Sequence, residues 1–147
     1  MRNSWLNGVD LTGANLTGAD MSGARLVKAK LDKANLTGVD LRQADMRNTS
    51  LNGANLTKAD LRQANLHGAY LPKANLNGAN LSGAIIRQVN FTGGNLNGAN
   101  LTGANLSLAD FTEVDLRGAD LTGASLVNVK WTGFKKDANT KGLPPGR

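Results

Sequence analysis

The chain has few side chains that could support catalysis. There is no cysteine, so disulfides and thiolate metal sites are impossible, and His67 is the one histidine. No serine, aspartate or glutamate is spaced so as to form a catalytic pair with it. We therefore expect a protein that is not an enzyme and has no cofactor, with His67 on a solvated surface.

Carboxylates at a spacing of 20 residues are the one pattern that suggests a metal. Asp20, Asp40 and Asp60 would need to lie close together to bind a cation, but Arg42 and Arg62 follow two of them. Arginines would neutralise these carboxylates, and calcium sites need a denser set of oxygen ligands. We expect carboxylate–arginine pairs here and no metal site.

The elements that would position these side chains follow a period of five. From Leu6 to Trp131 every fifth residue is large and apolar, 26 times in succession, and 20 of these residues are Leu. Two residues before each stands a small residue, which is Ala in 18 cases. The repeat reads Ala-(Asp/Asn)-Leu-(Thr/Ser/Arg/Asn)-Gly.

Neither a helix nor a straight strand keeps every fifth residue on one face, so the chain must bend once in each repeat. Counting Leu as the first residue of a four-residue turn, the third is Gly in 15 of 26 repeats, as a type II turn requires. In the other eleven repeats we expect a different turn. Those residues are Lys28, Lys33, Gln43, Asn48, Lys58, Gln63, Lys73, Gln88, Leu108, Glu113 and Asn128.

The run A-N-L-T-G-A-D-M-S-G-A, from Ala14 to Ala24, resembles the pentapeptide-repeat family, and the match extends over residues 4–133. The resemblance implies an all-β fold, a right-handed quadrilateral β-helix with four repeats per coil. Leu and the preceding Ala would point inward. The 26 repeats would then form about 6.5 coils of 20 residues.

Positions 20 apart then lie in columns, and two columns have a structural interpretation. Short Asn and Asp side chains bond the nearby backbone at corners, which explains one column without a ligand. Aromatic residues at inward positions fill a core, which explains another better than a ligand-stacking surface does. The first column is Asn15, Asn35, Asn55, Asn75, Asn95 and Asp115, and the second is Phe91, Phe111 and Trp131.

We predict three segments. Residues 1–5 would cover the N-terminal end of the core through Trp5, residues 6–133 would form the solenoid, and residues 134–147 would form a basic tail that contains Pro and Gly. Phe134, in a slot otherwise occupied by Ala, would cover the other end. The tail is too polar and Pro-rich to continue the coils, and it would fray.

The net charge of +6 would suggest a nucleic-acid partner, but most of it lies outside the repeats. Within them the charge is polarised between a basic cluster near the N-terminal end and an acidic cluster near the C-terminal end. For the basic cluster a solvated charged face is favoured over a phosphate-binding patch, and the acidic cluster is a second candidate patch. The basic cluster is Arg25, Lys28, Lys30 and Lys33, and the acidic cluster is Asp110, Glu113, Asp115 and Asp120.

No apolar segment of membrane-spanning or signal-peptide length is present, so we expect a cytoplasmic protein with no membrane contact. The leading hypothesis is a scaffold that binds another protein. The resemblance also implies a possible role as a topoisomerase-directed DNA mimic, which the positive net charge of the chain disfavours. Weak, nonspecific and salt-sensitive nucleic-acid binding through the basic cluster and tail, and end-to-end self-association, remain open.

Overall fold

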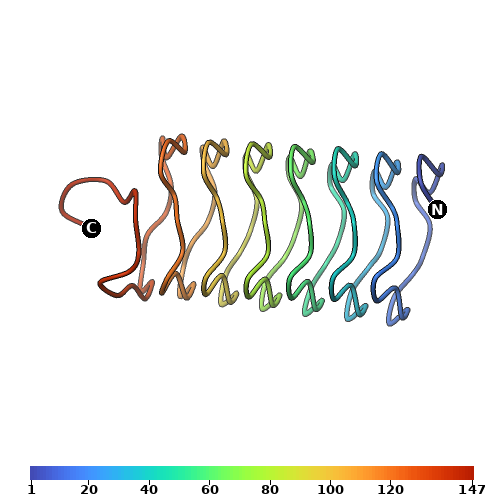
Figure 1. The fold of residues 1–147 in the computed structure, drawn as a ribbon, viewed down its shortest axis with the longest axis horizontal. Coiled ribbons are helices and arrows are strands. Elements are labelled where there is room, and N and C mark those ends of the chain that lie inside the picture. The colour runs from blue at the N-terminus through green and yellow to red at the C-terminus, as the bar shows by residue number, and fades with distance from the viewer.

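Successive turns of the chain stack with a spacing of 20 residues. In the computed structural model, which describes residues 1–147, the residue before each inward Leu pairs in a parallel β-bridge with the residue 20 positions later. These bridges extend from Trp5 with Arg25 to Asp115 with Lys135. Four repeats of five residues therefore form one coil, and the coils lie side by side along a rod (Figure 1).

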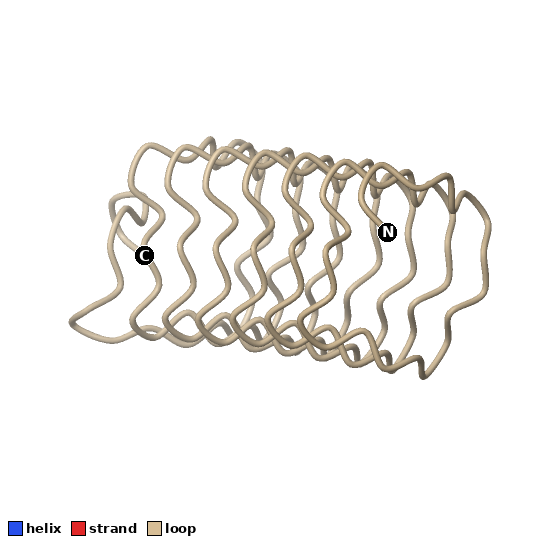
Figure 2. Ribbon diagram, turned by 45° about the vertical axis from the view of Figure 1, so that its right-hand side comes forward, coloured by secondary structure: helices blue, strands red, loops and turns tan.

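The rod contains no helix, and its extended residues pair singly instead of forming longer strands. Its backbone hydrogen bonds close the corners or join one coil to the next. Corners lie above corners along the length of the rod, as Figure 2 shows. No helix of a length and hydropathy suited to crossing a bilayer is found.

Each corner turns at a residue with positive φ. The glycines at the third turn position have φ between 65° and 73° along the solenoid, as expected. In Leu11–Ala14, for example, the N–H of Ala14 donates to the carbonyl of Leu11 at 3.0 Å. A residue in the left-handed backbone conformation at every fifth position therefore bends the chain.

The eleven corners without glycine use the same conformation, so the prediction of a different turn is wrong. Their third residues have φ between 55° and 63°. At Lys58, for instance, the turn hydrogen bond from Ala59 to Leu56 is 3.0 Å, and the Lys58 N–H donates to the Asn77 carbonyl of the next coil at 2.9 Å. The bond to the next coil requires the same backbone direction whichever side chain is present.

The inward Leu and Ala residues form one core of 41 buried residues that runs along the rod axis. One polar side chain is buried beside these 41, Thr49, whose hydroxyl donates to the Leu26 carbonyl at 2.7 Å. No buried side-chain nitrogen or oxygen lacks a hydrogen-bond partner. The predicted inward positions are therefore confirmed for the middle of the solenoid.

The aromatic column fills the core near the C-terminal end, as predicted. The rings of Phe91 and Phe111 lie 5.4 Å apart at 70°, and those of Phe111 and Trp131 lie 5.4 Å apart at 84°. Phe134 continues the series, with its ring centre 5.1 Å from that of Trp131. These edge-to-face contacts stabilise the core and leave no ring face free for a ligand.

Trp5 does not cover the N-terminal end. Its side chain is 72% exposed, because a residue directly before an inward position points away from the rod axis. The Arg25 guanidinium lies over its ring, 3.8 Å from the centre, in a cation–π contact. Residues 1–5 instead form one more corner, in which Asn3 has φ of 57° and donates its N–H to Ser22 at 2.8 Å.

The C-terminal segment continues the coil, contrary to the prediction. Lys135 pairs with Asp115, and Lys141 pairs with Asp120 after one extra residue. The Thr140 hydroxyl donates to the Leu116 carbonyl at 2.9 Å, and Leu143 packs against the core. Residues 135–143 therefore add two further sides and cover part of the C-terminal end.

Removing one inward side chain tests the core. Leu66 is fully buried in the middle of the rod, so Leu66→Ala leaves a cavity and should lower the free energy of unfolding by about 2–5 kcal/mol. Leu126 occupies the same column in the last coil and is only partly buried, so Leu126→Ala should cost clearly less. Urea unfolding followed by circular dichroism measures both, and equal losses would contradict the inward assignment.

Replacing a left-handed residue by glycine tests the corner conformation. Lys58→Gly relieves a strain of about 1–2 kcal/mol, offset in part by the greater unfolded-state entropy of glycine, so we expect a net gain of about 0.5–1 kcal/mol. Asn48→Gly should change stability by less than about 0.5 kcal/mol, because asparagine tolerates positive φ. Gly38→Ala, in the column of Lys58, should destabilise. A loss of stability in Lys58→Gly would contradict the proposed strain.

Candidate interaction surface

Outward Asn and Asp side chains accept hydrogen bonds from the backbone. The Oδ1 atom of Asn35 accepts the Thr37 N–H at 3.1 Å and the Thr37 hydroxyl at 2.7 Å, which closes an Asx turn. The bond to the N–H two residues later recurs along the predicted column. Its acceptors are Asn15, Asn35, Asn55, Asn75, Asn95 and Asp115. This column is a structural ladder, as predicted.

Wherever Arg follows Asp by two positions, its side chain folds back onto the carboxylate. Arg42 donates to Asp40 from Nε at 2.9 Å and from Nη2 at 2.7 Å, in a bidentate pair. The same geometry occurs in three further pairs. They are Asp45–Arg47, Asp60–Arg62 and Asp115–Arg117. Pairing of Asp40 and Asp60 with arginines is therefore confirmed.

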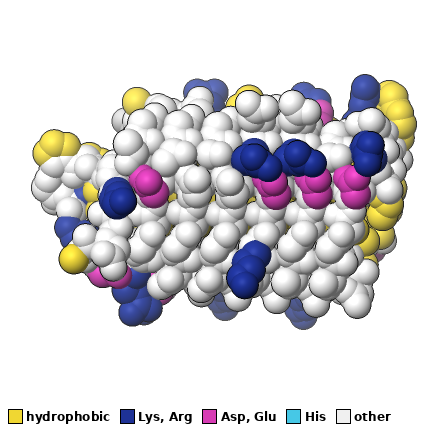
Figure 3. Space-filling model, in the orientation of Figure 1, with side chains coloured by type: hydrophobic (Ala, Val, Ile, Leu, Met, Phe, Trp, Pro, Cys, Tyr) yellow, Lys and Arg dark blue, Asp and Glu magenta, His cyan; other side chains and the backbone are white.

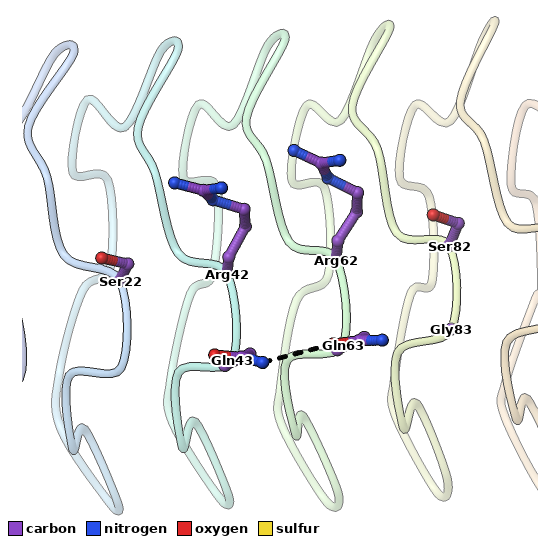
Figure 4. Close-up of a pocket in the computed structure, with 7 residues that line it drawn as sticks. All are labelled: Ser22, Arg42, Gln43, Arg62, Gln63, Ser82 and Gly83. Atoms are coloured by element: carbon purple, nitrogen blue, oxygen red, sulfur yellow. Dashed lines mark hydrogen bonds between the residues drawn. The ribbon is translucent and has the colours of Figure 1, made fainter.

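Two of these pairs lie beside the one surface depression, which we call the Arg–Gln corner. It is lined by Ser22, Arg42, Gln43, Arg62, Gln63, Ser82 and Gly83, none of them hydrophobic (Figure 4). The residues come from the same corner of four successive coils. The Arg side chains extend to one side of the corner, and the Gln side chains extend along the other. The result is a polar surface with equivalent groups at successive coils.

Within this corner one hydrogen bond joins neighbouring coils through side chains. The Gln43 amide Nε2 donates to Gln63 Oε1 at 3.3 Å. Arg42 Nε also lies 3.9 Å from the Asp60 carboxylate, so it interacts with the acids of two coils. These contacts hold long side chains in one arrangement across the two coils.

The charges of the Arg–Gln corner balance locally. Hydrogen bonds from Arg42 hold the pKa of Asp40 below its ordinary value, and Arg62 does the same for Asp60. In return the hydrogen bonds to these aspartates raise the pKa of both arginines. Figure 3 shows positive and negative side chains next to one another along this face. The corner is therefore rich in hydrogen-bonding groups without a strong net field.

The four residues of the basic cluster lie at two successive corners and on two faces of the second coil. Arg25 stacks on Trp5, and its bridge partner in the next coil is Asp45. Lys30 lies between Asp10 and Ser50 in its column. Hydrogen bonds from Thr12 are the main cause of the lowered pKa of Asp10, and the charge of Lys30 makes a smaller contribution. Lys28 and Lys33 occupy corner positions with positive φ.

The four residues of the acidic cluster lie on three different faces. Asp110, Asp115 and Asp120 belong to three separate bridge columns, and Glu113 occupies a corner. Asp110 lies 4.0 Å from Lys130, and Asp115 is paired with Arg117 at 2.6 Å. Two of the three columns therefore present the carboxylate beside a cation, and the structure does not bring the four together.

The remaining candidate groups are isolated. No group of three or more His, Cys, Asp or Glu side chains is placed to hold a metal ion. His67 lies at an outward position, half-buried, and its backbone N–H donates to Asn65 Oδ1 at 3.1 Å.

Sequence reasoning found the Arg and Asp residues of the corner but missed its glutamines. Gln43 and Gln63 were noted only as exceptions to glycine in the turn. The signal was available, because two amides at a spacing of 20 residues must stack once the coil length is known.

Asp20 provides a test of the electrostatics at the start of this face. Hydrogen bonds from the Ser22 hydroxyl and N–H, and then from Arg2, lower the pKa of Asp20 to about 2. A carboxylate with a lowered pKa stabilises the fold above its unfolded pKa of about 3.8, and that stabilisation disappears as pH falls toward 2.

An NMR titration of the Asp20 carboxyl checks this value. Ser22→Ala should raise the pKa more than Arg2→Gln does, because the hydroxyl is the largest cause of the shift. A pKa unchanged by Ser22→Ala would contradict the assignment.

Comparisons with known proteins agree with the repeat. The sequence matches the family model described as Pentapeptide repeats (8 copies) over residues 1–32, 29–68, 59–98 and 90–128. No match is found among curated proteins.

Similar solved structures include HetL, a pentapeptide repeat protein involved in heterocyst differentiation regulation from the cyanobacterium Nostoc sp. strain PCC 7120. It is 29% identical, with 90% of this chain and 87% of HetL covered and a TM-score of 0.45. A pentapeptide repeat protein from the Arabidopsis thaliana thylakoid lumen is 34% identical over 77% of this chain and 68% of its own, with a TM-score of 0.40. QnrB1, a plasmid-mediated fluoroquinolone resistance protein, is 25% identical over 92% of this chain and 81% of its own, with a TM-score of 0.34. The family model covers most of the chain, and this chain therefore belongs to the pentapeptide repeat family.

Proposed function

We propose that this chain is a non-catalytic scaffold that binds another protein through outward side chains, built as a right-handed quadrilateral β-helix. A continuous core of Leu and Ala supports the scaffold role, because it leaves no interior space in which a substrate could be enclosed. The one depression of the surface is the Arg–Gln corner. We place the binding surface there.

The observation that carries this proposal is the set of unused hydrogen-bonding atoms at the corner. Arg42 and Arg62 bond their aspartates through Nε and Nη2, so the Nη1 group of each remains available to a partner. The Gln43 Oε1 and Gln63 Nε2 atoms are likewise free of partners within the chain. Side chains already held by internal bonds lose less entropy on binding, which favours specific recognition.

The chemistry of these groups favours a protein partner with carboxylate and amide side chains. Arginine is enriched at the energetically important positions of protein interfaces, and its planar donors fit carboxylates. Hydrogen bonds at a fixed spacing between coils would give such a partner one register along the rod. The expected interface is polar, in keeping with the absence of hydrophobic residues from the corner.

Nucleic acid is a poorer fit to the same surface. Asp40 and Asp60 accept the strongest bonds of the two arginines and would repel a phosphate backbone. Imitation of DNA is also disfavoured, because it needs unopposed negative charge, and the carboxylates of the four Asp–Arg pairs each hold an arginine. Binding to nucleic acid would therefore be weak and salt-sensitive.

A capture experiment tests the proposal. The tagged chain is immobilised and incubated with native-source lysate at physiological salt after nuclease treatment, and retained proteins are identified by mass spectrometry. We expect one protein retained in stoichiometric amount. Arg42→Gln with Arg62→Gln should reduce its retention about tenfold or more, because both arginines lie at the centre of the corner.

Arg47→Gln with Arg117→Gln is the matched control. These arginines form the same bidentate pairs with aspartate and are exposed to the same degree, but they belong to other columns. The control should retain the partner as well as the unaltered chain does. Proteins that are retained only when the nuclease treatment is omitted would contradict a protein scaffold. Equal loss in both double variants would contradict the Arg–Gln corner as the surface.

A further inference from the structure

The N-terminal edge of the rod has backbone groups without partners in the chain. In later coils, the residue before each inward Leu bonds the preceding coil through both its N–H and its carbonyl. Arg25, for example, donates to the Ser4 carbonyl at 2.9 Å and accepts the Leu6 N–H at 2.7 Å. Trp5, Asp10 and Asn15 occupy this position in the first coil, and neither group of any of them is bonded. Three sides therefore present paired donors and acceptors along the rod axis.

The apolar core is also incompletely covered at this edge. Leu6, Leu11 and Leu16 are only partly buried, whereas the equivalent residues of the next coils are fully buried. Hydrophobic side chains are visible at the N-terminal end of the rod in Figure 3. At the opposite end Leu126 is also only partly buried, but Leu143, from the segment that follows the repeats, packs against the core there.

We propose that the first coil binds the first coil of a second copy of this chain, so that two rods join end to end in a closed dimer. A two-fold axis makes facing strands antiparallel. In that arrangement two opposed residues can exchange both of their N–H···O=C bonds. The unpaired residues each offer one donor and one acceptor on the same side, which is the arrangement this exchange requires. A second copy also has the same cross-section, so the sides of both first coils can meet at once.

The C-terminal end is already covered on two of its four sides, which favours two-fold pairing over growth into a filament. Head-to-tail stacking would need a last coil that is open on every side, but the segment from Lys135 to Lys141 already bonds two of its sides. The Gly118 N–H donates to Asp137 at 3.0 Å, and the Leu121 N–H donates to Lys141 at 2.8 Å. The N–H groups of Leu126 and Trp131, on the other two sides, are not bonded. Only two N-terminal ends can therefore pair along three sides at once, so association should stop at two copies.

Geometry limits how tightly this dimer can form. A side of five residues is at most about 16 Å long, so each copy buries no more than several hundred Å². Interfaces of that size are weak, and we expect a dissociation constant in the micromolar range or above. The basic clusters of the two copies would lie about three coil spacings apart, roughly 14 Å. Their repulsion is screened by salt, so added salt should strengthen the dimer.

Sedimentation velocity of the 147-residue chain over about 1–500 µM tests the proposal, with Asn15→Pro compared with Asn15→Ala. Both variants lose the bonds from Thr17 to the Asn15 side chain, but only proline removes the N–H at the open edge. That N–H has no partner in the monomer, so the fold should tolerate its loss. We expect a monomer–dimer equilibrium that Asn15→Pro weakens about tenfold or more relative to Asn15→Ala.

Thermal unfolding shows whether each variant still folds, and Asp10→Pro with Asp10→Ala provides a second pair should Asn15→Pro fail to fold. A chain that stays monomeric at every concentration would overturn the proposal. So would oligomers that grow beyond two copies, or a dimer that both proline variants leave unchanged. The Arg–Gln corner lies on the side of the rod and is not part of this interface, so loss of the dimer and loss of the bound protein are separate outcomes.

Discussion

The whole structure depends on one backbone constraint, a residue with positive φ at every fifth position. Each such residue turns the chain, and its N–H then points at the carbonyl of the next coil, as the bond from Gly13 to Asp32 at 2.9 Å shows. Four turns bring the chain back above itself, so the columns of 20 residues follow from the corner. Non-glycine residues are strained in this conformation, and the hydrogen bonds made by all the corners together offset that strain.

The sequence predicts the repeat, the inward residues and the Asx ladder, because each follows from a side chain's slot within five residues. It does not predict that Lys58 or Gln63 adopts positive φ, since local preference disfavours this and the bond to the next coil decides the outcome. Propensity is a weak guide wherever a tertiary hydrogen bond selects the backbone conformation.

The ends were predicted least well, because the repeat does not encode them. Trp5 looked like a cover on account of its size, but its slot directs it outward whatever residue occupies it. The C-terminal segment departs from the five-residue spacing at Lys141, where one extra residue is inserted. Asp137 accepts a hydrogen bond from Gly118 and Thr140 donates one to Leu116, and neither bond belongs to the repeating pattern. A closing segment of this kind can be recognised only from its contacts.

Side chains of the candidate surface are also paired within the chain, as the backbone groups are. An Asp with Arg two residues later forms an ion pair within its own repeat, so both charges of each such pair are engaged before any partner arrives. The core is likewise filled, and the coils satisfy one another's backbone. A partner must then bind the polar groups that have no hydrogen-bond partner within the chain. On the side of the rod we place this binding at the Arg–Gln corner, where paired arginines and stacked amides lie together. Along the axis we place it at the open edge of the first coil.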